Sequence, residues 1–376
     1  MTARDAVRGL AAVAAVSVAL TACGGRSGGG VSAEVSPSGA DASGPASWGD
    51  DGAAGPPSHE ESAPTGVVNL AFAGDVHFQL NLETLLDRPS RATLGPIART
   101  LAAADITMVN LETAITSRGT LQPKEFRFRT TPAALDVLDK AGVDVVTMAN
   151  NHAADYGPVG LLDTLRAIRT SPIPVVGVGR DRDAAFRPYR VTVGDTDLAF
   201  LGADSTPRET PNRIWGAGPD WAGTAAARTP HSPALLRAVR AASERDDVVV
   251  VYLHWGKEEQ RCPTANQQLT ARAVADAGAD VIVGAHAHVL LGAGWLGDTY
   301  VSYGMGNFLW YHNHEPETGV LQVRIRDGSV VADSFAPAQI QMFGHLRPLH
   351  GATRADAVAD WRALRQCTGL AARPPS

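Results

Sequence analysis

Five uninterrupted hydrophobic runs in this chain each stop at polar side chains that can bind metals or transfer protons. A continuous apolar run, unlike an alternating one, is typical of a strand that is covered on both faces. In open α/β sheets, sites lie beyond the carboxyl ends of such strands. The pattern therefore predicts a layered α/β fold with one site where these strands end. The segments are AFAGDVH (71–77), MVNLE (108–112), TMANNH (147–152), VVVVYLHWG (248–256) and VIVGAHAH (281–288).

Other segments complete the predicted α/β pattern. Further strands are expected at 173–179, 198–204 and 299–304. Near the C-terminus, VLQVRIRDGSVVADSF (320–335) alternates and contains an Asp-Gly pair, which predicts an antiparallel hairpin. A mixed sheet, or two packed sheets, follows from this mixture of strand types. The expected helices cover residues 95–104, 131–141, 158–169, 233–244 and 266–278.

The N-terminus has the marks of an export signal. Two arginines precede the apolar stretch 9–20, which is too short to span a bilayer as a helix. The following LTAC block resembles the bacterial lipobox, in which the cysteine is lipidated and becomes the mature N-terminus. An ordinary secretory signal with an incidental cysteine is the alternative. We expect a signal peptide over 1–22 and an extracytoplasmic protein that is anchored to the membrane through Cys23.

A tether is expected between the anchor and the folded part. Residues 24–65 are rich in Gly, Ser, Ala and Pro and contain almost no large apolar side chains, so burial cannot offset the entropy of ordering them. The predicted organisation is a disordered tether over 23–65, with a reach of about 35 Å, and a folded domain over 66–376. The net charge of -6, without a basic run in the folded part, argues against nucleic acid as a partner.

Two further cysteines, Cys262 and Cys367, lie in the folded part. In an oxidising compartment they could form a disulfide that closes a loop of about a hundred residues. Two free, buried thiols are the alternative, because sequence spacing does not show whether their Cα atoms lie within bonding distance.

The first two strand ends offer carboxylates. Asp75 and His77 lie two residues apart, so an extended backbone would direct both to one face. A carboxylate paired with an imidazole suits Zn, Mn or Fe better than Ca or Mg. Glu112 could bridge two cations held about 3.5–4 Å apart. A turn or a helix cap explains Asp75 and Glu112 equally well when each is taken alone.

The third strand end combines three functional groups. Asn151 offers an amide oxygen, His152 an imidazole that can exchange a proton near neutral pH, and Asp155 a carboxylate that could orient this ring. An Asx turn that leads into the next helix is the structural alternative.

Imidazoles follow the last two strands. His254 ends a buried strand, where an imidazole needs a partner. His286 and His288 would both point to the same face of an extended segment, although a lone buried histidine is more often structural. Asn307, in SYGMGNF, is expected in a tight loop that borders the pocket.

Taken together, the motifs resemble the calcineurin-like metallophosphoesterase superfamily, and more closely its CapA branch of capsule and poly-γ-glutamate synthesis proteins. The resemblance implies an αββα sandwich of mixed sheets flanked by helices. It extends over roughly residues 67–345. The segments that carry it are FAGDVHF, VNLET, FRFRTTPAALDVLDKAGVDVVTMANNHAADYG, HWGKE, GAHAHV and SYGMGNF.

The resemblance also implies a site with two divalent metal ions, Mn, Zn or Fe. His152 matches the residue that positions and protonates the leaving group, with Asp155 beside it. The bridging position holds a glutamate rather than the usual aspartate, as fits the CapA branch. By position, Asp75, His77 and His288 match the ligands of one metal, Asn151, His254 and His286 those of the other, and Glu112 the bridge.

The implied function is a metal-dependent phosphoesterase in capsule or poly-γ-glutamate biosynthesis. The expected partners are an anionic polymer or phosphoester substrate and other capsule-synthesis proteins, together with the membrane, which the lipid anchor at Cys23 predicts. A non-catalytic factor that assembles or attaches an anionic polymer is the main alternative, and hydrolysis of an amide bond is a third. The residues alone do not separate these three functions.

Overall fold

The fold is taken from a computed structural model that describes residues 66–87, 94–206, 215–312 and 314–375. The expected signal peptide 1–22 and the tether 23–65, including Cys23, lie outside the described residues. Within the described ranges, no helix is both long and apolar enough to cross a membrane.

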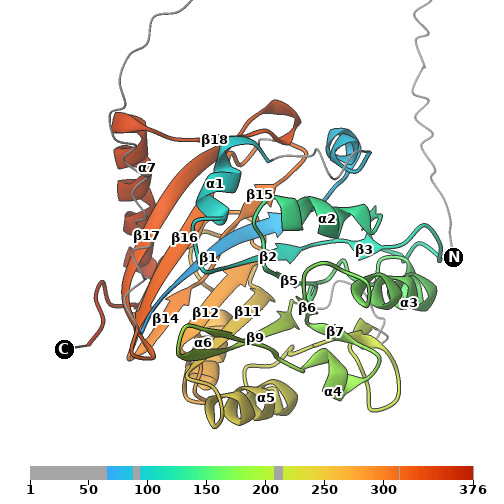
Figure 1. The fold of residues 1–376 in the computed structure, drawn as a ribbon, viewed down its shortest axis with the longest axis horizontal. Coiled ribbons are helices and arrows are strands. Elements are labelled where there is room, and N and C mark those ends of the chain that lie inside the picture. The colour runs from blue at the N-terminus through green and yellow to red at the C-terminus, as the bar shows by residue number, and fades with distance from the viewer. Residues whose placement is uncertain (1–65, 88–93, 207–214, 313, 376) are drawn as a thin grey trace, which may run out of the picture. The chain divides into compact units, whose positions relative to one another are not determined.

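Two mixed sheets form the centre of the fold (Figure 1). The first has eight strands: β1 (Val67–Val76), β2 (Ile106–Leu111), β5 (Val145–Thr147), β6 (Val175–Val176), β15 (Asn307–Leu309), β16 (Glu317–Arg326), β17 (Ser329–Ile340) and β18 (Leu346–Pro348). The second has six: β8 (Tyr189–Val193), β9 (Thr196–Ser205), β11 (Val248–Trp255), β12 (Val281–Ala285), β13 (Ala293–Leu296) and β14 (Thr299–Ser302). Two short pairs, β3 (Ala114–Ile115) with β4 (Arg129–Thr130) and β7 (Val178–Gly179) with β10 (Gly223–Thr224), lie outside these sheets.

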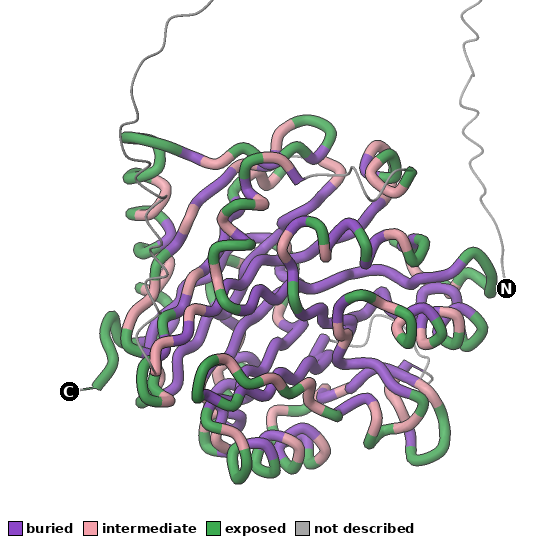
Figure 2. Tube along the Cα trace, viewed as in Figure 1, coloured by how far each residue is buried: buried purple, intermediate pink, exposed green. Residues whose placement is uncertain are grey.

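The helices are mostly short. The α-helices are α1 (Ala98–Leu101), α2 (Ala133–Lys140), α3 (Gly157–Ile168), α4 (Arg182–Ala185), α5 (Pro233–Ser243), α6 (Ala265–Ala275) and α7 (Gly351–Ala363). The 3-10 turns are η1 (Leu80–Leu85), η3 (Gly95–Ile97), η5 (Met342–Gly344) and η6 (Leu364–Cys367). Figure 2 shows that burial is concentrated in the strands, whereas the helices expose their outer sides.

β11 shows why the hydrophobic runs are uninterrupted. Its Val250 and Tyr252 belong to the core between the two sheets, whereas Val251 and Leu253 belong to the core under α5 and α6. Successive residues of a strand point to opposite faces, so burial of both faces requires a continuous apolar sequence. Helices α1, α2 and α3 cover the outer face of the first sheet in the same way. The layers are helix, sheet, sheet and helix, which confirms the predicted fold class.

Several predicted elements differ in detail from those observed. The helices predicted at 131–141, 158–169 and 233–244 begin and end within two residues of α2, α3 and α5. The helix predicted at 95–104 is only a 3-10 turn followed by one α-helical turn, because the chain must enter β2 at Ile106. The strand predicted at 173–179 divides into β6, in the first sheet, and β7, which pairs with β10.

Cys262 and Cys367 are joined by a disulfide, with their Cα atoms 5.7 Å apart and a separation of 105 positions in sequence. The bond ties η6 to the loop that follows β11. Replacing both cysteines with serine is expected to lower the free energy of unfolding by about 2–4 kcal/mol, because the unfolded chain gains conformational freedom. Denaturant titration of the oxidised wild type and the variant measures this difference. Equal midpoints and slopes would contradict the prediction.

Candidate metal centre

Asp75 links the carboxyl ends of three strands. Gly74 lets β1 pass against the loop before β15, because a Cβ at this position would lie 1.9 Å from the carbonyl oxygen of Gly306. The Asp75 side chain is fully buried. Its Oδ1 accepts a hydrogen bond from Asn110 Nδ2 at 2.7 Å, and its Oδ2 accepts one from the backbone N–H of His286 at 3.0 Å. The ends of β1, β2 and β12 therefore meet at this carboxylate.

Glu112 follows β2 directly and is also fully buried. Its Oε1 lies 3.2 Å from His254 Nε2 and 3.7 Å from His152 Nε2. On the other side of the His254 ring, Asn110 Nδ2 lies 3.1 Å from Nδ1. Strand ends from both sheets are therefore in direct contact through these side chains.

The loop after β5 carries Asn151, His152 and Asp155, all of which are buried. Asn151 Oδ1 lies 2.8 Å from His254 Nε2. His152 Nδ1 lies 2.6 Å from Asp155 Oδ2, so this carboxylate orients the ring. Lys124 Nζ, on a side chain with only 5% exposure, lies 3.0 Å from Asp155 Oδ1.

His286 and His288 reach the site by a different backbone path from the one expected. We expected an extended segment, but β12 ends at Ala285, and both histidines have left-handed backbone angles, φ 85° and φ 55°. Such angles are uncommon outside glycine and gather at functional sites. The tight turn aims the His286 N–H at the Asp75 carboxylate. His288 Nδ1 lies 2.8 Å from Asn307 Oδ1, so Asn307 borders the site through this ring.

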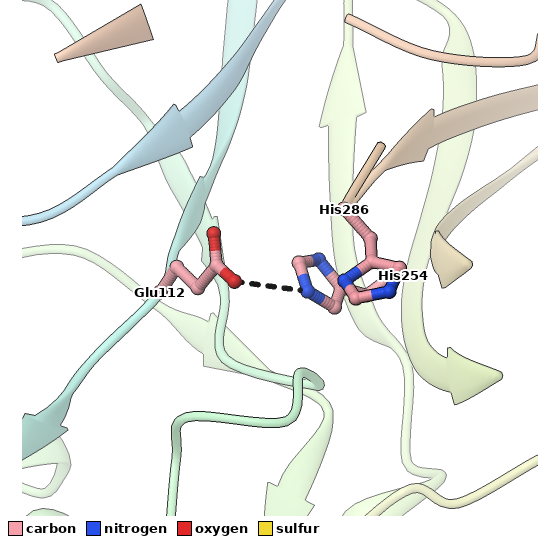
Figure 3. Close-up of side chains that lie close together, drawn as sticks. All are labelled: Glu112, His254 and His286. Carbon is pink, nitrogen blue, oxygen red and sulfur yellow. Dashed lines mark ion pairs between the residues drawn. The ribbon is translucent and has the colours of Figure 1, made fainter. Parts of the chain in front are cut away.

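Two groups of ligand-type atoms share Glu112. Within each group, one atom from every residue lies within 4.8 Å of the others. Figure 3 shows Glu112 facing the imidazoles of His254 and His286, which form the first group. The second group consists of Asp75, Glu112 and His288. His254 and His286 belong to the set that the resemblance implied for one metal, and Asp75 and His288 to the set implied for the other. A third group, Glu258 with His286 and His288, crosses these two sets.

His77 belongs to neither group. Its ring lies 4.9 Å from the Phe128 ring and 4.2 Å from the Trp310 ring, measured between centroids. Phe128 stacks in turn on His152 at 4.3 Å. The Nδ1 atom of His77 accepts a hydrogen bond from the Gln79 N–H at 3.0 Å. Its Nε2 atom is buried and has no hydrogen-bond partner among the described residues.

The electrostatics of the site favour a cation. Burial raises the pKa of Asp75 to about 7, and the neighbouring Glu112 carboxylate contributes to this rise. Burial also lowers the pKa of His286 well below its usual value and that of His288 to about 3. The site thus combines crowded carboxylates with neutral imidazoles, which is the protonation state in which an imidazole binds metals.

The donor set fits divalent transition metals. Carboxylate, amide and imidazole ligands together suit Mn, Zn or Fe. Two buried ring nitrogens, His77 Nε2 and His286 Nδ1, have no hydrogen-bond partner among the described residues. Buried polar atoms are normally satisfied, so such atoms at a site call for an explanation, and a bound cation supplies one.

The His152 and Asp155 pair differs from expectation in its proton affinity. We expected an imidazole that titrates near neutral pH. Burial, followed by the nearby Lys124 ammonium group, lowers the pKa of His152 well below that range. Burial raises the pKa of Asp155 to about 7, although Lys124 opposes this shift. Near neutral pH the His152 ring is therefore neutral, and Asp155 is the group of this pair that titrates.

A cavity of about 650 Å³ opens beside these groups. Its wall includes Lys124, His152 and His286, together with residues 256–259. We had not singled out Lys124 or Glu258 as ligands or as parts of the catalytic site. Both lie in loops, so no helix or strand periodicity in the sequence marks their positions. Only the tertiary fold brings them to the site.

A family model and several relatives that match this chain all carry names for capsule or PGA synthesis. Residues 69–312 match the family described as "Bacterial capsule synthesis protein PGA_cap". Over 259 residues, the chain is 30% identical to the PGA biosynthesis protein CapA of Bacillus subtilis, covering 65% of this chain and 63% of that protein. Over 216 residues, it is 31% identical to the capsule biosynthesis protein CapA of Bacillus anthracis, covering 54% and 49%.

One more relative and one solved structure are also similar to this chain. A probable polyglutamine synthesis accessory protein of Mycobacterium tuberculosis is 30% identical over 219 residues, which cover 54% of this chain and 58% of that protein. The chain therefore spans less than two thirds of the length of each of these three relatives. A crystal structure of a hypothetical protein from Thermus thermophilus aligns with 72% of this chain and 99% of that protein, at 19% identity and a TM-score of 0.46.

Proposed function

Because the chain belongs to the bacterial capsule synthesis protein family PGA_cap, we propose that it is an extracytoplasmic, metal-dependent phosphoesterase in capsule or poly-γ-glutamate biosynthesis. Relatives that are named for PGA or capsule biosynthesis support the proposed role in that process. The ligand-type side chains at the site support the proposed metal-dependent hydrolysis. Other capsule-synthesis proteins are the proposed partners.

One observation carries the proposal: Glu112 is buried and is shared by two groups of ligand-type side chains, which the strand ends of both sheets supply. A shared carboxylate is what two adjacent cations require, because it offsets their repulsion. When bound, two such ions acidify water and stabilise negative charge on a phosphoester. We propose that Asp75, His77 and His288 hold one ion, that Asn151, His254 and His286 hold the other, and that Glu112 is shared.

The remaining polar groups can position the substrate and move a proton. His152 Nε2 faces the Glu112 side of the site, while Asp155 holds the ring through Nδ1. Nε2, the ring nitrogen on the site side, is thus the atom placed to exchange a proton with a departing oxygen. Lys124 donates a hydrogen bond to the Asn151 carbonyl oxygen at 2.8 Å and lies on the cavity wall, where its charge favours an anionic substrate.

An assay with chromogenic phosphate esters tests the proposed activity. The purified protein is stripped with EDTA, reloaded with Mn, Zn or Fe, and given a nitrophenyl phosphodiester and a phosphomonoester. We expect turnover that disappears with EDTA and returns with metal. Bound metal without turnover would favour a second candidate, a non-catalytic assembly factor that binds an anionic polymer. Lys124 and Lys257 on the cavity wall offer positive charge to such a ligand, beside the carboxylates of three glutamates on the same wall.

We propose that the extracytoplasmic protein is anchored to the membrane by a lipid on Cys23. Cells that express the protein are grown with labelled palmitate, and the protein is then isolated. We expect label on the wild type and none on a Cys23→Ala variant, because the thiol is the attachment point. Label on the variant, or an unlabelled wild type, would contradict the anchor.

A further inference from the structure

The loop after β11 borders the open side of the metal centre. β11 delivers His254, and the chain then turns at Gly256, which has φ 102°. A Cβ on Gly256 would lie 2.7 Å from Gln267 Nε2, so glycine is required for this turn. The turn places residues 256–259 on the wall of the cavity.

Three contacts fix this loop. The backbone N–H of Glu259 donates a hydrogen bond to the carbonyl oxygen of Ala287 at 2.8 Å, and Ala287 lies between His286 and His288. Arg261 forms an ion pair with Glu315 at 2.7 Å. The disulfide of Cys262 ties the far end of the loop to η6. A side chain in this loop is therefore held in register with the two histidines.

Glu258 is the loop residue that faces these histidines. A carboxylate oxygen of Glu258 and one ring nitrogen each of His286 and His288 lie within 4.8 Å of one another. Glu258 is exposed, whereas His286 is buried and its Nδ1 has no hydrogen-bond partner among the described residues. The two imidazoles thus have carboxylates on two sides, Glu112 in the interior and Glu258 at the cavity.

We propose that Glu258 is a displaceable ligand of the metal centre, which binds from the cavity side and gives way to the anionic group of the substrate. This inference rests on the proposed function, because it needs a cation at His286 and His288. A carboxylate on a short, fixed loop can occupy a ligand position, while its exposure lets a stronger anion take its place. Glu258 would therefore strengthen metal binding and compete with the substrate.

Calorimetric titration with Mn²⁺ tests the first half of the proposal. In a Glu258→Gln variant of the full chain, we expect one of the two ions to bind about tenfold more weakly, because an amide is a poorer ligand than a carboxylate. The matched control is Glu259→Gln, which removes the same charge from the adjacent exposed residue. We expect its metal affinity to equal that of the wild type. Equal affinities in Glu258→Gln and wild type would overturn the proposal.

Titration of the metal-saturated proteins with inorganic phosphate tests displacement. An internal competitor lowers the apparent affinity of a ligand in proportion to the fraction of sites that it leaves free. Phosphate should therefore bind several-fold more tightly to Glu258→Gln than to wild type or Glu259→Gln. An equal gain in both variants would assign the effect to charge alone and overturn displacement. If the wild type takes up no divalent ions, the proposed function itself fails, which is a separate outcome.

Discussion

A Glu112→Gln variant is expected to lose bound metal and to retain less than about a thousandth of the wild-type phosphoesterase activity. Glu112 is the one carboxylate that both ligand groups share. An amide cannot offset the repulsion between two cations, so neither ion should be held at its usual affinity. The measurements are the metal content per chain after dialysis and the kcat on a phosphodiester.

The controls for this variant separate a lost site from a lost fold. Removing one of two buried carboxylates relieves the repulsion that contributes to the raised pKa of Asp75. The metal-free variant should therefore unfold at a temperature no lower than that of the metal-free wild type. Glu125→Gln, which changes an exposed carboxylate at the cavity, should keep its metal. Two tightly bound ions in Glu112→Gln would contradict the assignment.

The metal-free protein is expected to lose stability as the pH falls from about 7 to about 5. When a histidine has a lower pKa in the folded protein than in the unfolded chain, its contribution to stability is present at pH values above the unfolded-state pKa. That contribution is lost as the pH falls below the unfolded-state pKa. Burial lowers the pKa of His288 from 6.5 to about 3, which costs about 2 kcal/mol at pH 5. The same direction applies to three more buried imidazoles, those of His77, His152 and His286.

Two carboxyl groups change the stability of the protein with pH in the opposite direction. Burial raises the pKa of Asp75 and of Asp155 to about 7, so their contribution to stability is present below the unfolded value of 3.8 and is lost as the pH rises through about 7. In EDTA, an Asp75→Asn variant should therefore be more stable than wild type at pH 7, and this advantage should shrink toward pH 5. Denaturant titrations at several pH values measure both effects. A wild-type stability that is flat from pH 7 to 5 would contradict the account.

The buried strands were the most predictable part of the fold. A strand with both faces covered must be apolar along its buried length, as β11 is from Val248 to Leu253, so its sequence alone marks its place and its carboxyl end. The polar residue at that end then falls at the sheet edge. This logic predicted that Asp75, Glu112 and His254 converge, and the structure brings these three side chains together.

Features without such a pattern were not predictable. Helix α7 buries only Trp361, which stacks on Phe335, so its sequence carries little apolar periodicity. The left-handed turn at His286 and His288 leaves no signal in residue type, because neither is glycine. Lys124 joins the site through a loop, and its role depends on contacts that only tertiary structure creates.

The most direct test of the central claim is an anomalous scattering map from crystals of the protein loaded with Mn²⁺ or Zn²⁺. The account predicts two peaks on either side of Glu112, one beside His254 and His286 and the other beside Asp75 and His288. Loaded crystals without a peak at Glu112, or with bound ions only at surface carboxylates, would contradict the claim that the strand ends of the two sheets hold a pair of cations.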